Sequence, residues 1–263
     1  MNAAIRLRRR LLLPASLVFS LLLGLPSLIV VGRALQPEFI DALVSPVATE
    51  ALRLSLLTTS LSLVLMLIFA TPTAYWLARY RFPGHRLLDT LIDLPLVLPP
   101  TVAGVALLLT FGRRGVVGSL LSDIGINLAF TTTAVVMAQL FVATPLYIRA
   151  LKVGFASVPE TTEAAALTLG AGRWRTFWRV TLPLSFPFLI EGVVLAWARA
   201  LGEFGATIVF AGSFQGSTQT MPLAIYAALE SDLNVALALS AILTVTAFGL
   251  LLLFRYLTST ARN

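Results

Sequence analysis

The sequence predicts an all-α membrane protein that crosses the bilayer several times. Of its 263 residues, 58% are hydrophobic and only 12% are charged, and the mean hydropathy is +0.91. Soluble domains carry about 25% charged residues, so much of the usual charge is missing. Several apolar runs reach the ~20 residues that a helix needs to cross the hydrocarbon core of a bilayer. We therefore expect a polytopic protein with six transmembrane helices.

The first predicted span is Leu11–Val31, which follows the basic stretch RLRRR at residues 6–10. A signal peptide has the same order of segments, but its apolar core is only about 7–15 residues long. This run is longer and lacks a convincing A-x-A cleavage site, so we expect a retained span. Five further apolar runs complete the prediction: Leu52–Leu77, Leu87–Phe111, Phe130–Ala150, Pro187–Ala211 and Val235–Tyr256.

The basic residues predict the orientation of these spans. An even number of spans puts both chain ends on one side of the membrane. With the ends inside, the inner segments hold fourteen Arg and Lys residues and the outer segments hold four, while Arg199 falls within a span. Basic residues collect in cytoplasmic loops. We therefore expect cytoplasmic N- and C-termini and a cytoplasmic loop between the fourth and fifth spans.

Composition and motifs exclude several functions. A net charge of +7 would suggest nucleic acid binding in a soluble protein, but membrane topology accounts for it here, and we expect no nucleic acid partner. Cys is absent, which rules out disulfides, thiolate metal sites and a Cys nucleophile. There is no Walker A loop, no H-E-x-x-H and no G-x-S-x-G. We expect a chain without catalytic residues, bound metal or bound cofactor.

Prolines interrupt the third apolar run at LPLVLPP, Leu94–Pro100. They remove backbone donors and bend a helix, and such breaks persist in a membrane only where protein or a water-lined cavity satisfies the freed groups. A packing kink and a translocation pathway both remain open as explanations. The candidate pathway or interface residues here are Pro99, Pro100 and Thr101.

Three ionisable residues stand near the start of the same run. Asp89 and Asp93 are four residues apart, and charges at a helix entry are the favoured account of both. The single histidine, His85 in RFPGHR, is expected to be a solvated loop residue.

The fifth run contains opposite charges within ARALGEFGATIVF, residues 198–210. A charge at bilayer depth costs at least ~2.5–3.5 kcal/mol, so these groups should face protein or water. Arg199 and Glu203 are four residues apart and can neutralise one another on one helix face. Gly202 and Gly205 flank Glu203 and permit close helix approach. A structural pair and a pair lining a pathway or a dimer interface both remain open.

A polar interruption lies between the fourth and fifth runs, VPETTEAAALTLGAGRWRTFWRVTLP, Val158–Pro183. Ser157 as N-cap, with Pro in the first turn and Glu160 three residues after the cap, predicts a helix start. Gly170 suits the left-handed conformation that ends helices. A second, amphipathic helix should start near Arg173, and Pro183 should end it before the fifth span.

This stretch could contact either lipid headgroups or another protein. Its second half, with aromatic residues on one face and Arg175 and Arg179 on another, would fit an interfacial helix among lipid headgroups. Its first half fits lipid poorly, because acids beside a small alanine patch make a weak membrane anchor. An alanine ridge flanked by Glu160 and Glu163 is better shaped for a groove on another protein.

The pattern EAA at residues 163–165, then Gly170, Val180 and Leu182-Pro183, resembles the EAA loop of bacterial and archaeal ABC-importer permeases. In that family the loop is the coupling helix that docks on the cytoplasmic ATPase. The family places Glu six residues before the glycine, whereas here Glu163 is seven before it. The resemblance implies that residues 155–183 form the coupling loop, with contacts from Ser157, Glu160, Glu163, Ala164, Ala165, Leu169, Gly170, Arg173 and Arg175.

Further segments resemble the permease subunit of molybdate importers, with sulfate/thiosulfate and tungstate permeases as close alternatives. They are Leu94–Gly104, Thr168–Leu184, Ala198–Gly212 and Thr218–Glu230. The resemblance implies a type I ABC-importer-like permease fold in a single domain, residues 1–263, within the plasma membrane of a bacterium or archaeon. It also implies a homodimer, two ATPase subunits that bind ATP and Mg, an extracytoplasmic oxyanion-binding protein and surrounding membrane lipid.

Two other classes remain as alternatives. An ion-coupled secondary transporter would need intramembrane carboxylates, and Glu203 is the only well-placed candidate. Such carriers often contain inverted repeats, which this sequence does not show. The other alternative is a membrane scaffold that transports nothing. It would not explain why one chain combines the loop at residues 155–183, a broken third run and a charged fifth run.

Overall fold

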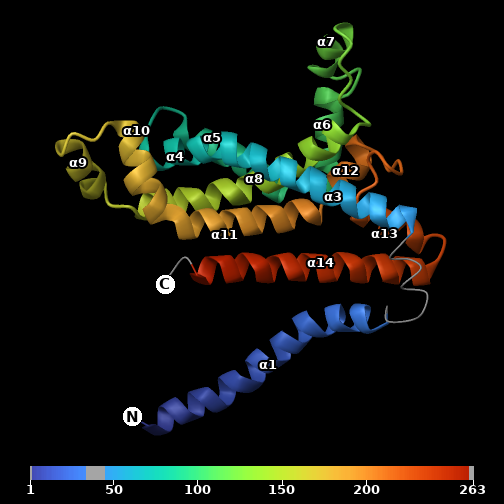
Figure 1. Ribbon diagram of the computed structural model, residues 1–263, viewed down its shortest axis with the longest axis horizontal. Helices are drawn as coiled ribbons and strands as arrows, with labels where there is room; N and C mark the ends of the chain where they lie inside the picture. The colour runs from blue at the N-terminus through green and yellow to red at the C-terminus, as the bar shows by residue number, and fades with distance from the viewer. Residues whose placement is uncertain (1, 34–44, 261–263) are drawn as a thin grey trace.

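The computed structural model describes residues 2–33 and 45–260, and all of its regular structure in these ranges is helical (Figure 1). The order of elements in the first half is α1 (Asn2–Arg33), α3 (Pro46–Leu65), η1 (Met66–Ala70), α4 (Thr71–Arg79), α5 (His85–Val97), α6 (Pro100–Phe111), α7 (Gly118–Asp123) and α8 (Thr132–Ser157). The second half consists of α9 (Glu160–Thr168), α10 (Arg173–Thr176), η2 (Phe177–Thr181), α11 (Leu182–Leu201), α12 (Gly205–Phe210), α13 (Met221–Leu229) and α14 (Leu233–Thr260).

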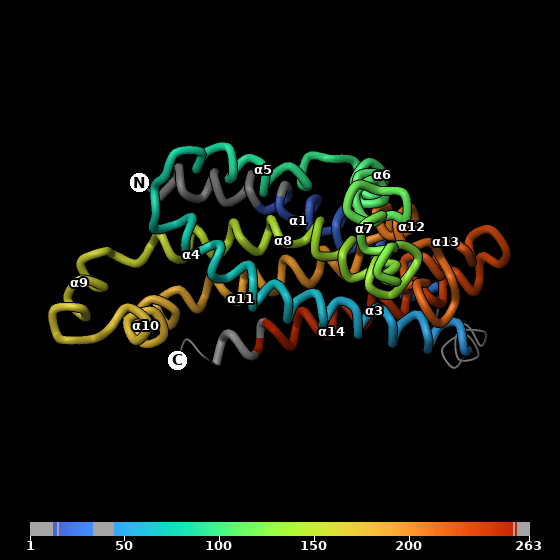
Figure 2. Tube along the Cα trace, turned by 90° about the horizontal axis from the view of Figure 1, so that it is seen from above, coloured from blue at the N-terminus to red at the C-terminus, as the bar shows by residue number. Residues whose placement is uncertain are grey.

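The long helices form an elongated bundle. Within the described ranges, five helices are long and apolar enough to cross a membrane, and six if the bent pair α5 and α6 counts as one span. This agrees with the six predicted spans. Helix α1 begins, and α14 ends, at the end of the bundle that carries α9 and α10, while α13 lies at the opposite end (Figures 1 and 2). The side of the membrane on which each end lies stays a prediction.

Helix α8 is the centre of the bundle, since 61% of its most apolar window is buried. It packs most extensively on α11, and glycines let the two backbones approach. A Cβ atom at Gly154 would lie 2.5 Å from Cβ of Phe188, and one at Gly192 would lie 2.9 Å from Leu151. Around this contact, Leu77, Tyr147 and Phe155 belong to the largest buried cluster.

Two π-helical turns interrupt the helices that flank α8. Turn η1 lies between α3 and α4, and η2 lies between α10 and α11. Each is followed at once by a proline in the first turn of the next helix, Pro72 in α4 and Pro183 in α11. The wider π turn lets the helix continue past a residue that cannot donate a backbone hydrogen bond.

The sequence predicted that Pro183 ends a separate amphipathic helix, and this prediction is wrong. The chain runs as one 29-residue helical stretch, Arg173–Leu201. The predicted fifth span, Pro187–Ala211, is wrong at both ends, because this stretch begins earlier and stops at Leu201. The residues that follow form the short helix α12.

The third predicted span, Leu87–Phe111, is not a continuous helix. Helices α5 and α6 meet at an angle of 119°, and Leu98 and Pro99 between them are extended. Successive prolines remove the donors that would carry the helix through this point. Helix α6 therefore leaves the bundle, and α7 follows at its far end (Figure 1).

Candidate functional site

Helix α9 lies at the end of the bundle as a nearly bare helix with no buried residue. Ala164 and Ala165 are exposed, and Leu169 at the C-cap is 89% exposed. Gly170 has φ of +84°, which confirms the predicted left-handed helix end. The outer face of α9 thus offers small and apolar side chains to a partner.

The predicted start of this helix is wrong. Ser157 is the last residue of α8, where its hydroxyl donates to the carbonyl of Gly154 at 2.7 Å. Pro159 is the N-cap of α9 and provides no side-chain hydrogen bond. Helix α8 therefore ends at Ser157, the residue expected to cap α9, and the Ser157 hydroxyl satisfies a carbonyl of the last turn of α8.

Glu163 points inward and binds two other elements. Its Oε1 accepts a hydrogen bond from Nη2 of Arg79 in α4 at 2.7 Å and one from the hydroxyl of Thr181 in η2 at 2.6 Å. The same Arg79 nitrogen donates to the carbonyl of Val158 at 3.0 Å. Side chains of Arg79 and Glu163 are only 9% and 15% exposed. We call Arg79, Glu163 and Thr181 the clasp.

Within the chain, the clasp gives Glu163 a positioning role, because its carboxylate joins α9 to α4 and η2. Its contact with an ATPase stays a prediction. Charge-assisted hydrogen bonds are stronger than neutral ones, so α9 is held firmly to α4 and η2. Arg79 and Thr181 were not among the predicted site residues. The one available signal was the departure in spacing that puts Glu163 one residue early, on the inner side of the helix.

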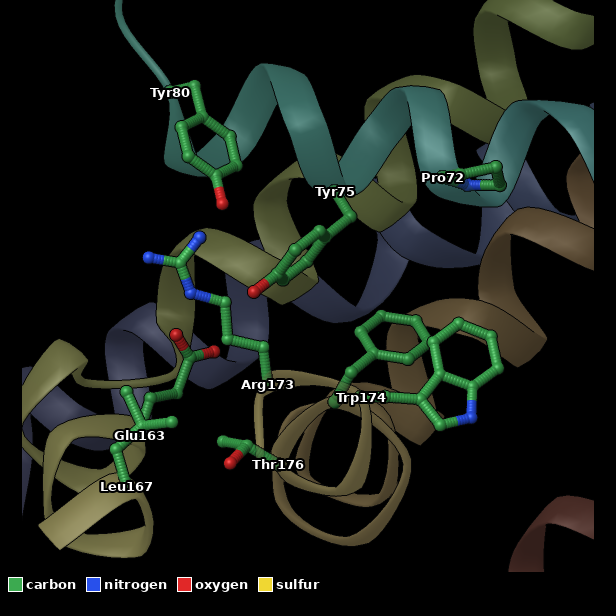
Figure 3. Close-up of a pocket in the computed structure, with 9 residues that line it drawn as sticks. Pro72, Tyr75, Tyr80, Glu163, Leu167, Arg173, Trp174 and Thr176 are labelled. Atoms are coloured by element: carbon green, nitrogen blue, oxygen red, sulfur yellow. The ribbon is translucent and has the colours of Figure 1, made fainter. Parts of the chain in front are cut away.

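A cavity of about 380 Å³ lies beside the clasp, lined by residues of α4, α9, α10 and the start of η2. Arg173 lines it, and Glu163 forms part of its wall (Figure 3). Arg175, also expected to contact a partner, is exposed and does not line this cavity. Glu160 is exposed at the start of α9.

The second predicted group of residues meets where α11 ends. Nη1 of Arg199 lies 2.7 Å from Oε2 of Glu203, which confirms the predicted ion pair. Glu203 is 1% exposed and Arg199 is 33% exposed. The two residues do not share a helix, however, because α11 stops at Leu201. The other carboxylate oxygen, Oε1, accepts from the backbone N–H of Ala206 at 2.8 Å and so caps α12.

The broken third and fifth runs pack directly on one another. A Cβ atom at Gly205 in α12 would lie 2.5 Å from Cβ of Pro100. One at Gly104 in α6 would lie 2.7 Å from Cβ of Val209. Pro99 and Thr101 stand exposed on either side of the contact. We call this contact of α6 with α12, together with the Arg199–Glu203 pair, the junction.

Within this chain Gly202 makes no close helix approach, and its place at a dimer interface stays a prediction. It is the exposed C-cap of α11, and the nearest atom to a Cβ there would be the carbonyl oxygen of Ala198 at 3.6 Å. Its position leaves ordinary room for a side chain. Of the two glycines beside Glu203, only Gly205 is required by packing.

Three residues near the third run have roles other than those expected. Asp93 accepts two hydrogen bonds of 2.7 Å from Arg149, and Asp89 pairs with Lys152 at 2.5 Å. These carboxylates join α5 to α8 and are not merely helix-entry charges. His85 is only 6% exposed, with its Nε2 3.0 Å from the carbonyl oxygen of Leu77, so the expectation of a solvated loop residue was wrong.

The described residues offer little to a metal. Among them, no group of three or more His, Asp or Glu side chains is placed to hold a metal ion. Four carboxylates, those of Asp89, Asp93, Glu163 and Glu203, are each paired with one Arg or Lys side chain. This arrangement suits the joining of helices.

Residues 70–262 match the family of binding-protein-dependent transport system inner membrane components. The probable transport system permease protein NifC of Clostridium pasteurianum is 39% identical over 93% of this chain and 86% of its own length. The molybdenum transport system permease protein ModB of Mycobacterium tuberculosis is 45% identical over 89% of this chain and 87% of its own. A probable sulfate transport system permease protein, cysT of Chlorokybus atmophyticus, is 37% identical over 83% of this chain and 77% of its own.

The fold also matches a solved structure. A bacterial alginate ABC transporter, crystallised in complex with an alginate pentasaccharide-bound periplasmic protein, superposes with a TM-score of 0.75 over 96% of this chain and 93% of the matched chain. The two sequences are 18% identical.

Proposed function

The chain belongs to the family of binding-protein-dependent transport system inner membrane components, and from this premise we propose that it is the permease subunit of an ATP-driven molybdate importer. It is a multi-pass membrane protein of the ABC importer class and has no hydrolytic role of its own. Relatives named as molybdenum permeases reach 45% identity over 89% of the chain, against 37% over 83% for a relative named as a sulfate permease. Molybdate is therefore favoured over sulfate, with tungstate as a further tetrahedral oxyanion.

The coupling surface is the outer face of α9. Two cytoplasmic ATPase subunits, which bind ATP and Mg, would each receive one such helix. The clasp supports this assignment, because it holds α9 from the inner side through Glu163 and leaves Ala164, Ala165 and Leu169 bare. Exposed apolar side chains at a rigid helix end are suited to a protein groove.

The path of α11 supports a mechanism of alternating access. The helical stretch Arg173–Leu201 begins shortly after α9, carries Thr181 of the clasp, and ends at the junction. This continuity is the observation that carries the mechanism. Closure of the ATPase pair would displace α9, and the clasp would pass this displacement to α4 and α11. The ATPases shift the equilibrium only by their differential affinity for the two states of the permease.

A homodimer forms the translocation pathway in this proposal. Helices α6 and α7 and the turn between them expose large apolar side chains along an arm that leaves the bundle, among them Leu109, Val116 and Leu120. A second copy would cover part of this arm and enclose a pathway beside the junction. Broken helices are typical of substrate pathways at membrane depth, because their ends provide backbone groups to the cavity.

The oxyanion is delivered by an extracytoplasmic binding protein, and the proposed membrane is the inner membrane of a bacterium. The permease need not bind the ion tightly, because conduction requires sites weak enough to release it. Selectivity would therefore be set mainly by the binding protein.

The test is the ATPase activity of the complete complex in lipid, with its binding protein, measured over a range of molybdate, tungstate and sulfate concentrations. We expect stimulation by molybdate or tungstate at far lower concentrations than by sulfate. Stimulation by sulfate alone would transfer the chain to the sulfate importers and leave the mechanism intact. Failure to associate with any ATPase would overturn the proposal.

A further inference from the structure

The cavity beside the clasp has polar groups at one side and apolar walls at the other. The guanidinium of Arg173 lies on the same side of the cavity as the hydroxyl-bearing ends of Tyr75 and Tyr80 and the carboxylate of Glu163 (Figure 3). Pro72, Trp174 and Phe177 form apolar parts of its wall. The Tyr75 hydroxyl already interacts with Arg79 of the clasp. The guanidinium of Arg173 and the hydroxyl of Tyr80 are suitable ligands for a phosphate group, whereas the remaining walls suit hydrocarbon.

The one acid on the wall does not oppose an anion strongly. Glu163 lies 2.7 Å from Arg79 and accepts a further hydrogen bond from Thr181 at 2.6 Å. Its charge is therefore already paired, and Arg173 adds a second cation to the same region. Arg175 in α10 and Arg179 in η2 are exposed as well. The surroundings of the cavity are thus net positive.

The position of the cavity indicates where such a ligand would come from. The cavity lies against α4 and α10–η2, which are the ends of two candidate membrane spans, Pro46–Arg79 and Arg173–Leu201. Trp174 is 74% exposed and Trp178 is 50% exposed, with ring centroids 5.6 Å apart. Exposed tryptophans beside arginines are typical of the boundary between lipid headgroups and hydrocarbon.

We propose that this cavity binds the headgroup of an anionic phospholipid, with its phosphate at Arg173 and its acyl chains leaving past Trp174. A lipid matches both halves of the cavity, whereas a soluble anion would leave the apolar walls unfilled. Basic pockets at the cytoplasmic ends of membrane helices bind such headgroups. If the proposed function holds, the bound lipid also bridges α4, α9 and α10, which all line the cavity, and makes coupling depend on anionic lipid.

The experiment is native mass spectrometry of the whole permease–ATPase complex released from nanodiscs containing phosphatidylglycerol or phosphatidylcholine. We expect retained phosphatidylglycerol on the unmodified complex and about tenfold weaker retention after Arg173→Gln. Tyr80→Phe, which removes only a hydroxyl, should weaken retention less. The matched control is Arg86→Gln, an exposed arginine of α5 that does not line the cavity, and it should retain lipid as the unmodified complex does.

Two outcomes would overturn the proposal. Equal retention by the Arg173 and Arg86 variants would place the lipid elsewhere. Displacement of the lipid by soluble glycerol phosphate at similar concentration would mean that the cavity takes free phosphate. Because lipid retention is measured without transport, an error in the proposed substrate would leave this result unaffected.

Discussion

The clasp and the junction each contain an Arg–Glu pair with an N–O distance of 2.7 Å. The two pairs differ in how far apart in sequence the groups that they connect are. Glu203 binds groups close to it in sequence, Arg199 four residues before and Ala206 three residues after. Glu163 binds Arg79 and Thr181, which are 84 and 18 residues away. The junction pair therefore stabilises a local break in one chain segment, whereas the clasp joins three separate elements.

The clasp and the junction also differ in how closely the residues around them are packed. The junction is packed so closely that Gly205 leaves no room for a Cβ atom beside Pro100. Helix α9, held by the clasp, buries none of its residues. A close-packed region resists deformation, whereas an element attached mainly through one polar cluster can respond as a unit to a partner. The comparison predicts that junction variants change stability and that α9 variants change coupling.

The largest expected effect on stability is that of Glu203→Ala. The variant leaves Arg199 without its partner and removes the cap of α12, and breaking a buried ion pair costs about 3–5 kcal/mol. Because Arg199 is 33% exposed, we expect the lower end of that range for the free energy of unfolding in detergent. Glu191→Gln, at an exposed position of α11, is the matched control and should not lower it. Equal stability of both variants would show that the junction pair is not structural.

A smaller loss of stability is expected for Gly205→Ala. The added methyl group would overlap Pro100, and overpacking costs about 1–3 kcal/mol. Gly202→Ala provides the comparison, since its nearest neighbour would be at 3.6 Å and the effect should stay within about 0.5 kcal/mol. Thermal unfolding of the two variants measures the difference. If Gly202→Ala were the more harmful, the packing of α6 on α12 would be misassigned.

The clasp should couple two distant residues energetically. Arg79→Gln and Glu163→Gln should each lower the amount of molybdate imported per ATP hydrolysed, and the double variant should be hardly worse than either. Residues in one network show interaction energies of about 0.5–3 kcal/mol. Arg81→Gln, two residues beyond Arg79 and exposed, should leave the ratio unchanged. Strictly additive losses would contradict a shared clasp.

The smallest change in stability is expected on the outer face of α9. Residue 164 is exposed in the folded state as well as in the unfolded state. Ala164→Arg should therefore alter the free energy of unfolding by no more than about 0.5 kcal/mol. It should nevertheless weaken ATPase binding and uncouple hydrolysis from uptake, as co-purification and uptake assays would show. Ala227→Arg, on an exposed position of α13 at the other end of the bundle, should leave ATPase binding unchanged. Normal uptake with Ala164→Arg would refute the docking surface.

The features that the sequence predicted correctly depend on local pattern. Apolar runs of sufficient length specify membrane helices whatever their neighbours are, and Gly170 was recognisable because a left-handed helix end favours glycine. The Arg199–Glu203 pair was predictable because four residues of separation bring two long side chains together even where the helix ends between them.

Tertiary structure alone decided the rest. Pro183 was expected to end a helix, but a preceding π turn lets the helix continue, and no pattern around that proline reveals this. Arg79 is an ordinary basic loop-side residue in the sequence, and only the packing of α4 against α9 and η2 makes it the partner of Glu163. The sequence determined which segments enter the membrane, because burial of apolar side chains is a property of composition. Which segments meet was decided by the fold, because such contacts join residues far apart in the chain.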